Sequence, residues 1–177
     1  MLSAPEPLSA DHDVAAFSCG KPALDEWLKQ RALFNQENGF TVVMVVHQAG
    51  RVVGYYGVAP TAVNRASSPR AIRAGQAPDP VPCLLLGQFA VDREWAGRGI
   101  GSGLFKHAMT RCVSAARLIG GRAVVVNAVD DDAARYWRSR DFIPSKDDPL
   151  VLFRSIRKIA ASLEEGARKA HGAKEFP

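Results

Sequence analysis

The segment Asp92–Met109, DREWAGRGIGSGLFKHAM, places four glycines between two expected elements of secondary structure. The apolar stretch before it, CLLLGQFAV at residues 83–91, is short and typical of a buried β-strand. Apolar side chains at helical spacing follow and predict a helix that ends near Leu118, before Gly120 and Gly121. The chain therefore turns from strand to helix through its most flexible residues, at positions 97, 99, 101 and 103.

A glycine-rich turn at the start of a helix suits an anionic ligand. Glycine lets the backbone approach the ligand closely, and the free N–H groups and the helix dipole then favour negative charge. The segment lacks the G-K-[ST] sequence of a nucleotide P-loop, and its glycine spacing does not form the dinucleotide pattern G-x-G-x-x-G. We expect a phosphate site of another kind; the alternative is a turn built only for close helix packing.

The order of expected elements predicts an α/β domain of three layers with a mixed sheet. A helix covers most of residues 19–39, a β-hairpin covers 40–60, and a long connection at 61–82 leads to the strand described above. A fourth strand is expected in RAVVVNAV at 122–129, and a late strand in PLVLFRSI at 149–156. Between them a helix is expected in AARYWRSR at 133–140, with DDD at 130–132 offering carboxylates for its N-cap. Residues 1–155 are predicted to form a single domain, and residues 156–177 a C-terminal amphipathic helix with a frayed tail.

Composition narrows the possible functions. The three cysteines are scattered and the four histidines lie apart in the sequence, so we expect neither a disulfide framework nor a metal site. No apolar run approaches the ~20 residues that span a bilayer, and a basic-then-apolar leader is missing, which predicts a cytoplasmic protein without membrane contact. The net charge of +5 favours polyanionic partners, either nucleic acid or an acidic small ligand.

The stretch AGRGIGSGL at 96–104 resembles the R/Q-x-x-G-x-G/A loop of the GNAT superfamily of acyl-CoA N-acyltransferases, whose order of elements is also the one expected here. The resemblance implies the GNAT fold and a loop that binds the pyrophosphate of acetyl-CoA, with no metal. Ala96 stands where the family usually has Gln or Arg.

Three longer stretches resemble the GNAT toxins of bacterial toxin–antitoxin systems: FSCGKPALDEWLKQRA at 17–32, VVGYYGVAP at 52–60 and PDPVPCLLLGQFAVDREWAGRGIGSGL at 78–104. This resemblance implies acetylation of the α-amino group of aminoacyl-tRNA, a block of translation, a ribbon-helix-helix antitoxin as partner, and a homodimer as a common assembly. Gln88 stands where many of these toxins have Arg, which is expected to weaken a polar contact near the active site.

The same resemblance implies which residues hold the cofactor. The strand before the loop offers its backbone to the pantetheine and the thioester, and Asn127 is a second candidate for the pantetheine; the alternative for Asn127 is a buried amide that satisfies a local bulge. The implied cofactor-binding residues are Phe89, Ala90, Val91, Gly97, Arg98, Gly99, Ile100, Gly101, Ser102, Asn127, Ala134 and Trp137.

The position of the catalytic tyrosine is ambiguous. Counting back from Phe142 in the family pattern FYxxxGF, the tyrosine position holds Trp137, while Tyr136 lies one residue earlier, roughly 100° around a helix. Either the Tyr136 hydroxyl reaches the thioester sulfur as general acid, or Tyr136 packs in the core and Trp137 lines the pocket. We favour Tyr136, because an indole N–H cannot supply a proton at neutral pH. Asp141 replaces the usual Gly of that pattern, and Asp tolerates a left-handed turn better than most residues.

Binding of tRNA requires spread-out basic side chains. Basic residues on the expected first helix, in the long connection and near the thioester end are candidates: Lys29, Arg31, Arg65, Arg70, Arg73, Arg135, Arg138 and Arg140. Of these, Lys29, Arg31, Arg73 and Arg138 are chosen as the tRNA contacts. The alternative is a solvated basic surface, or a docking face for an acidic tail of the antitoxin. Two other functions stay open: a GNAT enzyme for a small amine or a protein amino group, and a non-catalytic CoA-binding module.

Overall fold

A computed structural model describes residues 1–172; the frayed tail expected at the C-terminus lies in residues 173–177, outside the described part. Seven strands form one sheet in the order β1-β2-β3-β4-β5-β7-β6. Their bounds are β1 Glu6–Pro7, β2 Val42–Gln48, β3 Arg51–Val63, β4 Val81–Val91, β5 Ala123–Asn127, β6 Ile143–Pro144 and β7 Val151–Ser155. The β4–β5 pair is parallel and the other pairs are antiparallel, so the predicted mixed sheet is confirmed.

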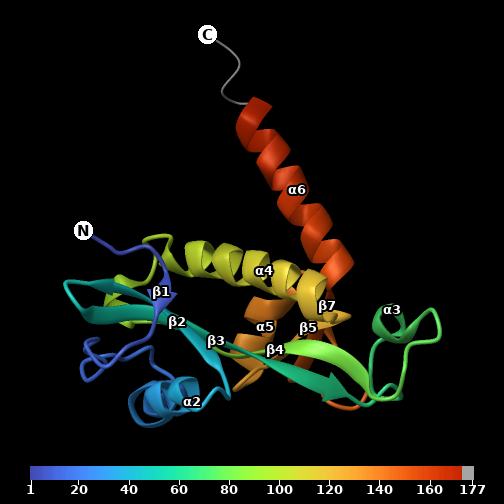
Figure 1. Cartoon of the computed structure of the whole chain (residues 1–177), viewed down its shortest axis with the longest axis horizontal. Helices are drawn as coiled ribbons and strands as arrows, with labels where there is room; N and C mark the ends of the chain where they lie inside the picture. The colour runs from blue at the N-terminus through green and yellow to red at the C-terminus, as the bar shows by residue number, and fades with distance from the viewer. Residues whose placement is uncertain (173–177) are drawn as a thin grey trace.

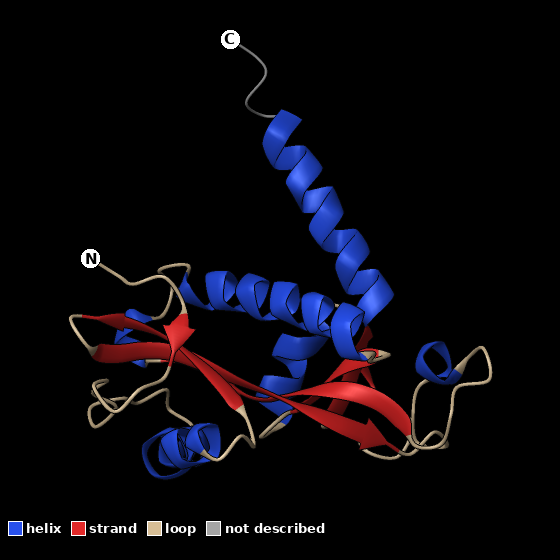
Figure 2. Cartoon of the chain, in the orientation of Figure 1, coloured by secondary structure: helices blue, strands red, loops and turns tan. Residues whose placement is uncertain are grey.

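Helices cover both faces of the sheet, as the long α4 above it and α2 below it show (Figures 1 and 2). The helices are α1 Pro22–Trp27, η1 Leu28–Ala32, α2 Leu33–Glu37, α3 Arg70–Arg73, η2 Arg93–Trp95, α4 Ile100–Ile119, α5 Asp131–Arg138 and α6 Ile156–Gly172. Successive strand residues point to opposite faces. Tyr56 therefore packs in the cluster under α4, while the neighbouring Tyr55 packs in the cluster under α1 and η1.

Helix α4 lies directly against the sheet at its N-terminal end. Ile100 and Leu104 on α4 face Gly54 on β3, where an added Cβ would lie 2.7 Å from Leu104 Cδ1. Glycine at this position therefore lets the start of α4 sit low on the sheet, next to the end of β4. That contact fixes the glycine-rich turn relative to the strand that precedes it.

The structure differs from the sequence-based elements in its irregular parts. The expected first helix contains a π-helical turn, η1, and two short edge strands, β1 and β6, were not predicted. Strand β3 extends to Val63, so the connection to β4 is shorter than expected, and it contains the short helix α3. In the described part of the chain, no helix combines the length and apolar character that a bilayer span requires. Helix α6 projects beyond the body of the protein, away from the sheet (Figure 1).

Candidate active site

The two parallel strands at the centre of the sheet separate after three pairs of residues. Leu84–Leu86 pair with Val124–Val126, and beyond them β4 has a bulge, because Gln88 pairs with Gly57 while Leu86 pairs with Val58. Residues 88–91 of β4 are thus paired with β3 on one edge only. The edge that faces β5 is free to pair with an extended ligand.

A cleft of about 330 Å³ opens where the two strands separate, and most of its lining is apolar. It is lined by Cys19, Lys21, Leu24, Phe89, Ala90, Val91, Trp95, Ala96, Gly97, Gly101, Val129, Asp132, Ala133, Tyr136 and Trp137. A narrow extension between the strands reaches Gly87 and Asn127. The predicted strand residues Phe89, Ala90 and Val91 therefore lie together along the cleft, beside the start of the glycine turn.

The glycine turn presents unpaired backbone donors. Gly97 and Gly99 have φ of +75° and +80°, and Gly99 is the N-cap of α4. Gly103 is the first residue whose N–H bonds back into the turn, to the Gly99 carbonyl at 3.0 Å. Within the described residues, the N–H groups of residues 97–102 have no recorded hydrogen-bond partner. Free donors at the positive end of a 20-residue helix form an anion site.

Side chains contribute little to this anion site. The Arg98 guanidinium lies 4.6 Å over the Trp95 ring, and Ile100 is buried against Gly54. Both residues therefore offer the ligand their backbone N–H groups, and Ser102 adds an exposed hydroxyl. An arrangement that works through the backbone explains why Ala96 can occupy the position of the family's usual Gln or Arg.

Asp92 anchors the turn and was missed in the sequence. Its carboxylate is buried and accepts hydrogen bonds from the N–H groups of Ser18 at 3.1 Å and Glu94 at 2.9 Å. Arg51 lies 3.7 Å from the same carboxylate. Asp92 therefore ties the end of β4 to the segment before α1, which forms the opposite wall of the cleft. An Asp directly after the predicted strand, at the start of a turn, is the signal that could have identified it, because Asp is a preferred N-cap residue.

Tyr136 and Trp137 both line the cleft, as expected for Trp137, but only Tyr136 brings a hydroxyl to it. The Tyr136 ring stacks on Phe89 with centroids 6.1 Å apart, and its buried hydroxyl has no hydrogen-bond partner among the described residues. Trp137 is almost fully buried and packs edge-to-face on Phe89 and Phe142. Burial raises the pKa of the Tyr136 phenol above its ordinary value, while the nearby Arg140 guanidinium opposes the rise. The arrangement supports the account in which Tyr136 is the proton donor.

Three further residues near the cleft, Asp141, Asn127 and Ala134, can be compared with their expected positions. Asp141 has φ of +64°, which confirms the left-handed turn expected there. Asn127 is exposed and lines the narrow extension of the cleft, so the alternative of a buried amide is wrong. Ala134, expected at the cofactor, is instead buried in the core, and Ala133 on the same helix faces the cleft. That exchange follows from the rotation of about 100° per helical residue.

A cluster of charged residues bridges the mouth of the cleft. Lys21 Nζ lies 2.6 Å from Asp130 Oδ2 and 3.4 Å from Asp132 Oδ2, which connects the start of α1 to the start of α5. Asp130 is also the N-cap of α5, because its side chain accepts the N–H of Ala133 at 2.8 Å, as expected from the DDD sequence. The hydrogen bond with Asp130 raises the pKa of Lys21 and lowers that of Asp130. This bridge orients the helix that carries Tyr136.

The four candidate tRNA contacts do not form one group. Lys29 and Arg31 are exposed on η1, and Arg138 is exposed at the end of α5, the helix of Tyr136. Arg73 lines a different hollow, around α3, which shares no residue with the cleft. Figure 1 shows α3 at the end of the sheet opposite to the start of α4. The structure therefore does not place Arg73 at the mouth of the cleft.

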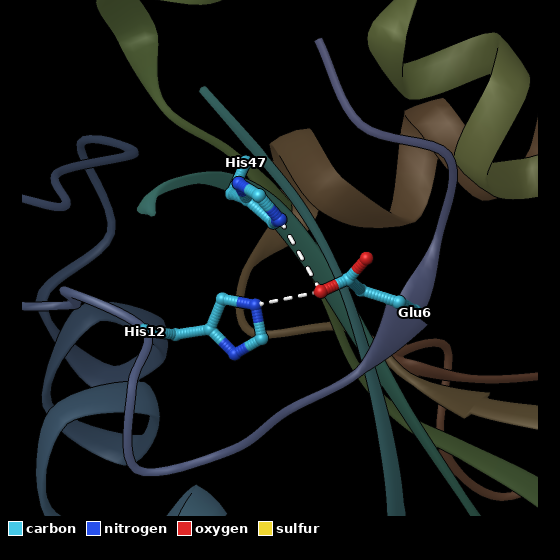
Figure 3. A group of neighbouring side chains, drawn as sticks. All are labelled: Glu6, His12 and His47. Carbon is cyan, nitrogen blue, oxygen red and sulfur yellow. Dashed lines mark hydrogen bonds and ion pairs between the residues drawn. The ribbon is translucent and has the colours of Figure 1, made fainter. Parts of the chain in front are cut away.

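Two of the histidines, far apart in sequence, meet at one carboxylate. His12 Nε2 and His47 Nε2 lie 3.1 and 3.2 Å from Glu6 Oε1 (Figure 3). This corrects the expectation that the histidines are isolated. The Nδ1 atoms accept the N–H groups of Ser9 and Gly50, so each ring carries its proton on Nε2 and donates it to Glu6. A metal at Nε2 requires the opposite polarity, with Nδ1–H as donor; the group instead fastens the N-terminal segment to β2.

A helix N-terminus with free N–H groups, a free strand edge leading away from it, and an unpaired phenol at the far wall define the site of an acyl-CoA-dependent acyltransferase. Similarity to known proteins leads to the same class. The sequence profile of the acetyltransferase (GNAT) family matches residues 9–142, and the chain belongs to that family.

Individual relatives are similar to this chain in sequence or in structure over about nine-tenths of its length. A tRNA-acetylating toxin of Mycobacterium tuberculosis (strain H37Rv) is 45% identical over 159 residues, which cover 90% of this chain and 95% of the toxin. The structure of AtaT complexed with acetyl-methionyl-tRNAfMet matches with a TM-score of 0.82 and 27% identity, over 91% of this chain and 98% of AtaT. A tyrosine-to-phenylalanine variant of AtaT, bound to the C-terminus of the antitoxin AtaR and acetyl-CoA, matches with a TM-score of 0.78 and 27% identity, over 93% and 99% of the two chains.

Proposed function

We propose that this protein is a toxin that transfers the acetyl group of acetyl-CoA to the α-amino group of aminoacyl-tRNA and thereby blocks translation in the cytoplasm. The observation that carries the proposal is the unpaired hydroxyl of Tyr136 in a cleft that begins at the glycine turn. The 45% identity to a tRNA-acetylating toxin supports the substrate.

The residues of the cleft fit acetyl-CoA. The six N–H groups of residues 97–102 suit a pyrophosphate, and the free edge of residues 88–91 suits the amide groups of a pantetheine arm. Asn127, on the far side of the narrow extension, is positioned for a further hydrogen bond to that arm. Acetyl-CoA supplies an acetyl group activated as a thioester, and the chain supplies its orientation and a proton.

Tyr136 supplies that proton. As the amine nitrogen bonds to the acetyl carbon and the carbon–sulfur bond breaks, the Tyr136 O–H gives its proton to the departing sulfur. The amine loses one proton to solvent, and the Tyr136 phenolate takes one proton back from solvent, so the products are the amide and the free thiol and the phenol is restored. The phenol is in its acid form at neutral pH, because the ordinary pKa of a tyrosine is about 10 and burial raises the pKa of Tyr136 further. Phe89 stacks on the Tyr136 ring, and the Arg140 guanidinium carbon lies 4.6 Å from the centroid of that ring. These two contacts orient the phenol.

The cleft offers no strong general base. Among its lining residues only Lys21 and Asp132 are charged, and Asp132 is engaged by Arg135 and Lys21, which lower its pKa. An α-amino group has a pKa of about 8 in peptides, so a substantial fraction is neutral at the pH of a cytoplasm. An acceptor of this kind needs no base, whereas a lysine side chain with a pKa of about 10.4 does. The site therefore favours an α-amine over a protein lysine.

A protein antitoxin is the expected partner, as in the AtaT–AtaR complexes. The ribbon-helix-helix type of that antitoxin and a homodimer of the toxin belong to the proposal. Size-exclusion chromatography with light scattering measures the assembly directly.

The test is acetyl transfer from labelled acetyl-CoA to a pool of charged tRNA, with deacylated tRNA as control. Label on charged tRNA alone supports the proposal. Label on small amines or protein but not on tRNA would favour the general GNAT enzyme, and tight acetyl-CoA binding without CoA release would favour a non-catalytic module.

A further inference from the structure

Two hollows flank the short helix α3 at one end of the sheet. Arg65, Arg70 and Arg73 line the first, with a volume of about 520 Å³, and Arg122, Arg157 and Lys158 line the second, of about 370 Å³. Helix α3 contributes Arg70 and Arg73 to the first hollow and Ala71 to the second, so the two are adjacent. We call these six basic residues the α3 face.

The α3 face accounts for the net charge of the whole protein. The sequence has 23 Lys and Arg against 18 Asp and Glu. Six of the basic residues and one acidic residue, Asp79, line the two hollows, which leaves 17 of each sign elsewhere. The formal charge of +5 is therefore that of this one region, and the rest of the chain is neutral.

The charges of the α3 face are not neutralised within the protein. In the part of the chain that the structure describes, none of the six side chains forms an ion pair, although basic residues elsewhere do. Asp79 accepts the backbone N–H of Arg65, and Arg73 Nε is buried without a hydrogen-bond partner among the described residues. The Arg122 guanidinium holds α3 in place by donating hydrogen bonds to the backbone carbonyls of Ile72 at 3.0 Å and Ala74 at 3.1 Å. The face therefore combines two arginines held by backbone carbonyls, Arg65 and Arg122, with exposed basic side chains that carry unneutralised charge.

The α3 face lies outside the catalytic cleft, and hydrogen bonds join the segment that carries α3 to the loop beside the end of α5. The hollows share no lining residue with the cleft. Residues 64–80, which connect β3 to β4 and contain α3, contact the loop between β6 and β7: the Ser67 carbonyl accepts the Lys146 N–H at 3.1 Å. Arg138 at the end of α5 lies 3.5 Å from the Pro149 carbonyl of the same loop. A ligand that enters the cleft and also neutralises the α3 face must be long and carry many spaced negative charges.

We infer that the α3 face binds the sugar–phosphate backbone of the tRNA at a distance from its aminoacylated end, an inference that rests on the proposed function. Basic side chains without an acidic partner bind phosphates without reading the sequence. Such contacts anchor the RNA body and leave the choice of amino acid to the cleft. They would also explain how a small apolar cleft selects an amine carried on a macromolecule over a free amino acid.

The test compares two variants with equal loss of charge. The first, Arg70→Gln/Arg157→Gln/Lys158→Gln, removes exposed side chains of the α3 face for which the structure records no bond. The control, Arg111→Gln/Arg117→Gln/Arg168→Gln, removes exposed charges from α4 and α6. Binding of deacylated tRNA is measured over a range of salt concentrations. Acetylation is measured on intact aminoacyl-tRNA and on its aminoacylated 3′-terminal trinucleotide.

We expect the α3 variant to bind tRNA about tenfold or more weaker than the control at about 0.1 M salt, with a slope of log K against log salt smaller by about two to three. Turnover of the trinucleotide should be unchanged. Equal effects of the two variants, or unchanged tRNA binding with lost binding of an acidic antitoxin, would overturn the inference. If the wild type binds tRNA through this face but acetylates no aminoacyl-tRNA, the proposed function fails and the inference stands.

Discussion

Removing one oxygen from the cleft gives the sharpest prediction. Tyr136→Phe keeps the ring that stacks on Phe89 and lies under Arg140, and deletes only the hydroxyl. That hydroxyl forms no hydrogen bond of good geometry within the described residues, and its polar neighbour is the Arg140 guanidinium, so its loss costs the resting protein little. Folding stability should therefore stay the same or rise slightly, because a buried unsatisfied polar group is costly.

Activity should respond differently. A hydrogen bond to a charged group contributes about 1.5–3 kcal/mol, and 1.36 kcal/mol corresponds to tenfold in rate, which gives a loss of roughly 10- to 160-fold in kcat. Proton transfer in the transition state would extend the loss towards about 10⁴-fold. KM for acetyl-CoA should change little, because the phenol acts on the sulfur only as the bond breaks.

The assay is steady-state acetylation of charged tRNA, with thermal unfolding measured on the same samples. Tyr56→Phe is the matched control: the Tyr56 hydroxyl is bonded to His107 Nδ1 at 2.8 Å and does not line the cleft. The Tyr56→Phe variant should lose about 1 kcal/mol of folding stability and keep the kcat of the wild type. Turnover of Tyr136→Phe within twofold of wild type would refute the assignment of Tyr136 as proton donor.

Three further predictions concern the turn, the sheet and the mouth of the cleft. Gly99→Ala adds a Cβ into open space but at φ of +80°, so it should cost about 1–3 kcal/mol of strain and raise KM for acetyl-CoA without lowering kcat on saturation; isothermal titration with acetyl-CoA checks it, and unchanged affinity would contradict it. Gly54→Ala meets Leu104 Cδ1 at 2.7 Å and should destabilise the fold by about 1–3 kcal/mol in urea unfolding, whereas an unchanged midpoint would argue against the close packing of α4. The lowered pKa of Asp130, whose ordinary value is 3.8, adds stability that is fully present above that pH and lost as the pH falls through the lower folded-state value; the stability gap between wild type and Asp130→Asn, which keeps a capping side chain, should close on acidification, and a constant gap would disprove this contribution.

The regular parts of the fold could be predicted from the sequence because their signals are local. The β-branched and apolar runs predicted the central strands, and the glycines at 97 and 99 predicted the turn whose positive φ values the structure shows. Strands β1 and β6 have two residues each and carry no periodicity. Their pairing depends on segments far away in the sequence, as when Glu6 pairs with Val45.

The site could be predicted only in part, for the same reason. The turn and Phe89 to Val91 are contiguous, so one motif located them, whereas the choice between Tyr136 and Trp137 depended on the rotation of α5. That rotation is set by the Asp130 cap, the bridge to Lys21 and the packing of Trp137 on Phe142, none of which the spacing reveals. The meeting of His12 and His47 at Glu6, and the position of Arg73 away from the cleft, likewise follow from tertiary structure.

The most direct measurement is the mass of the acetylated product. Charged tRNA is incubated with acetyl-CoA and either wild type or Tyr136→Phe, digested with ribonuclease, and the aminoacyl-adenosine fragments are fragmented in the mass spectrometer. The account predicts one acetyl group on the α-nitrogen of the amino acid with the wild type, and a much slower appearance of the same product with the variant. Acetyl groups on a side chain or on RNA, or none on any aminoacyl-adenosine, would contradict it.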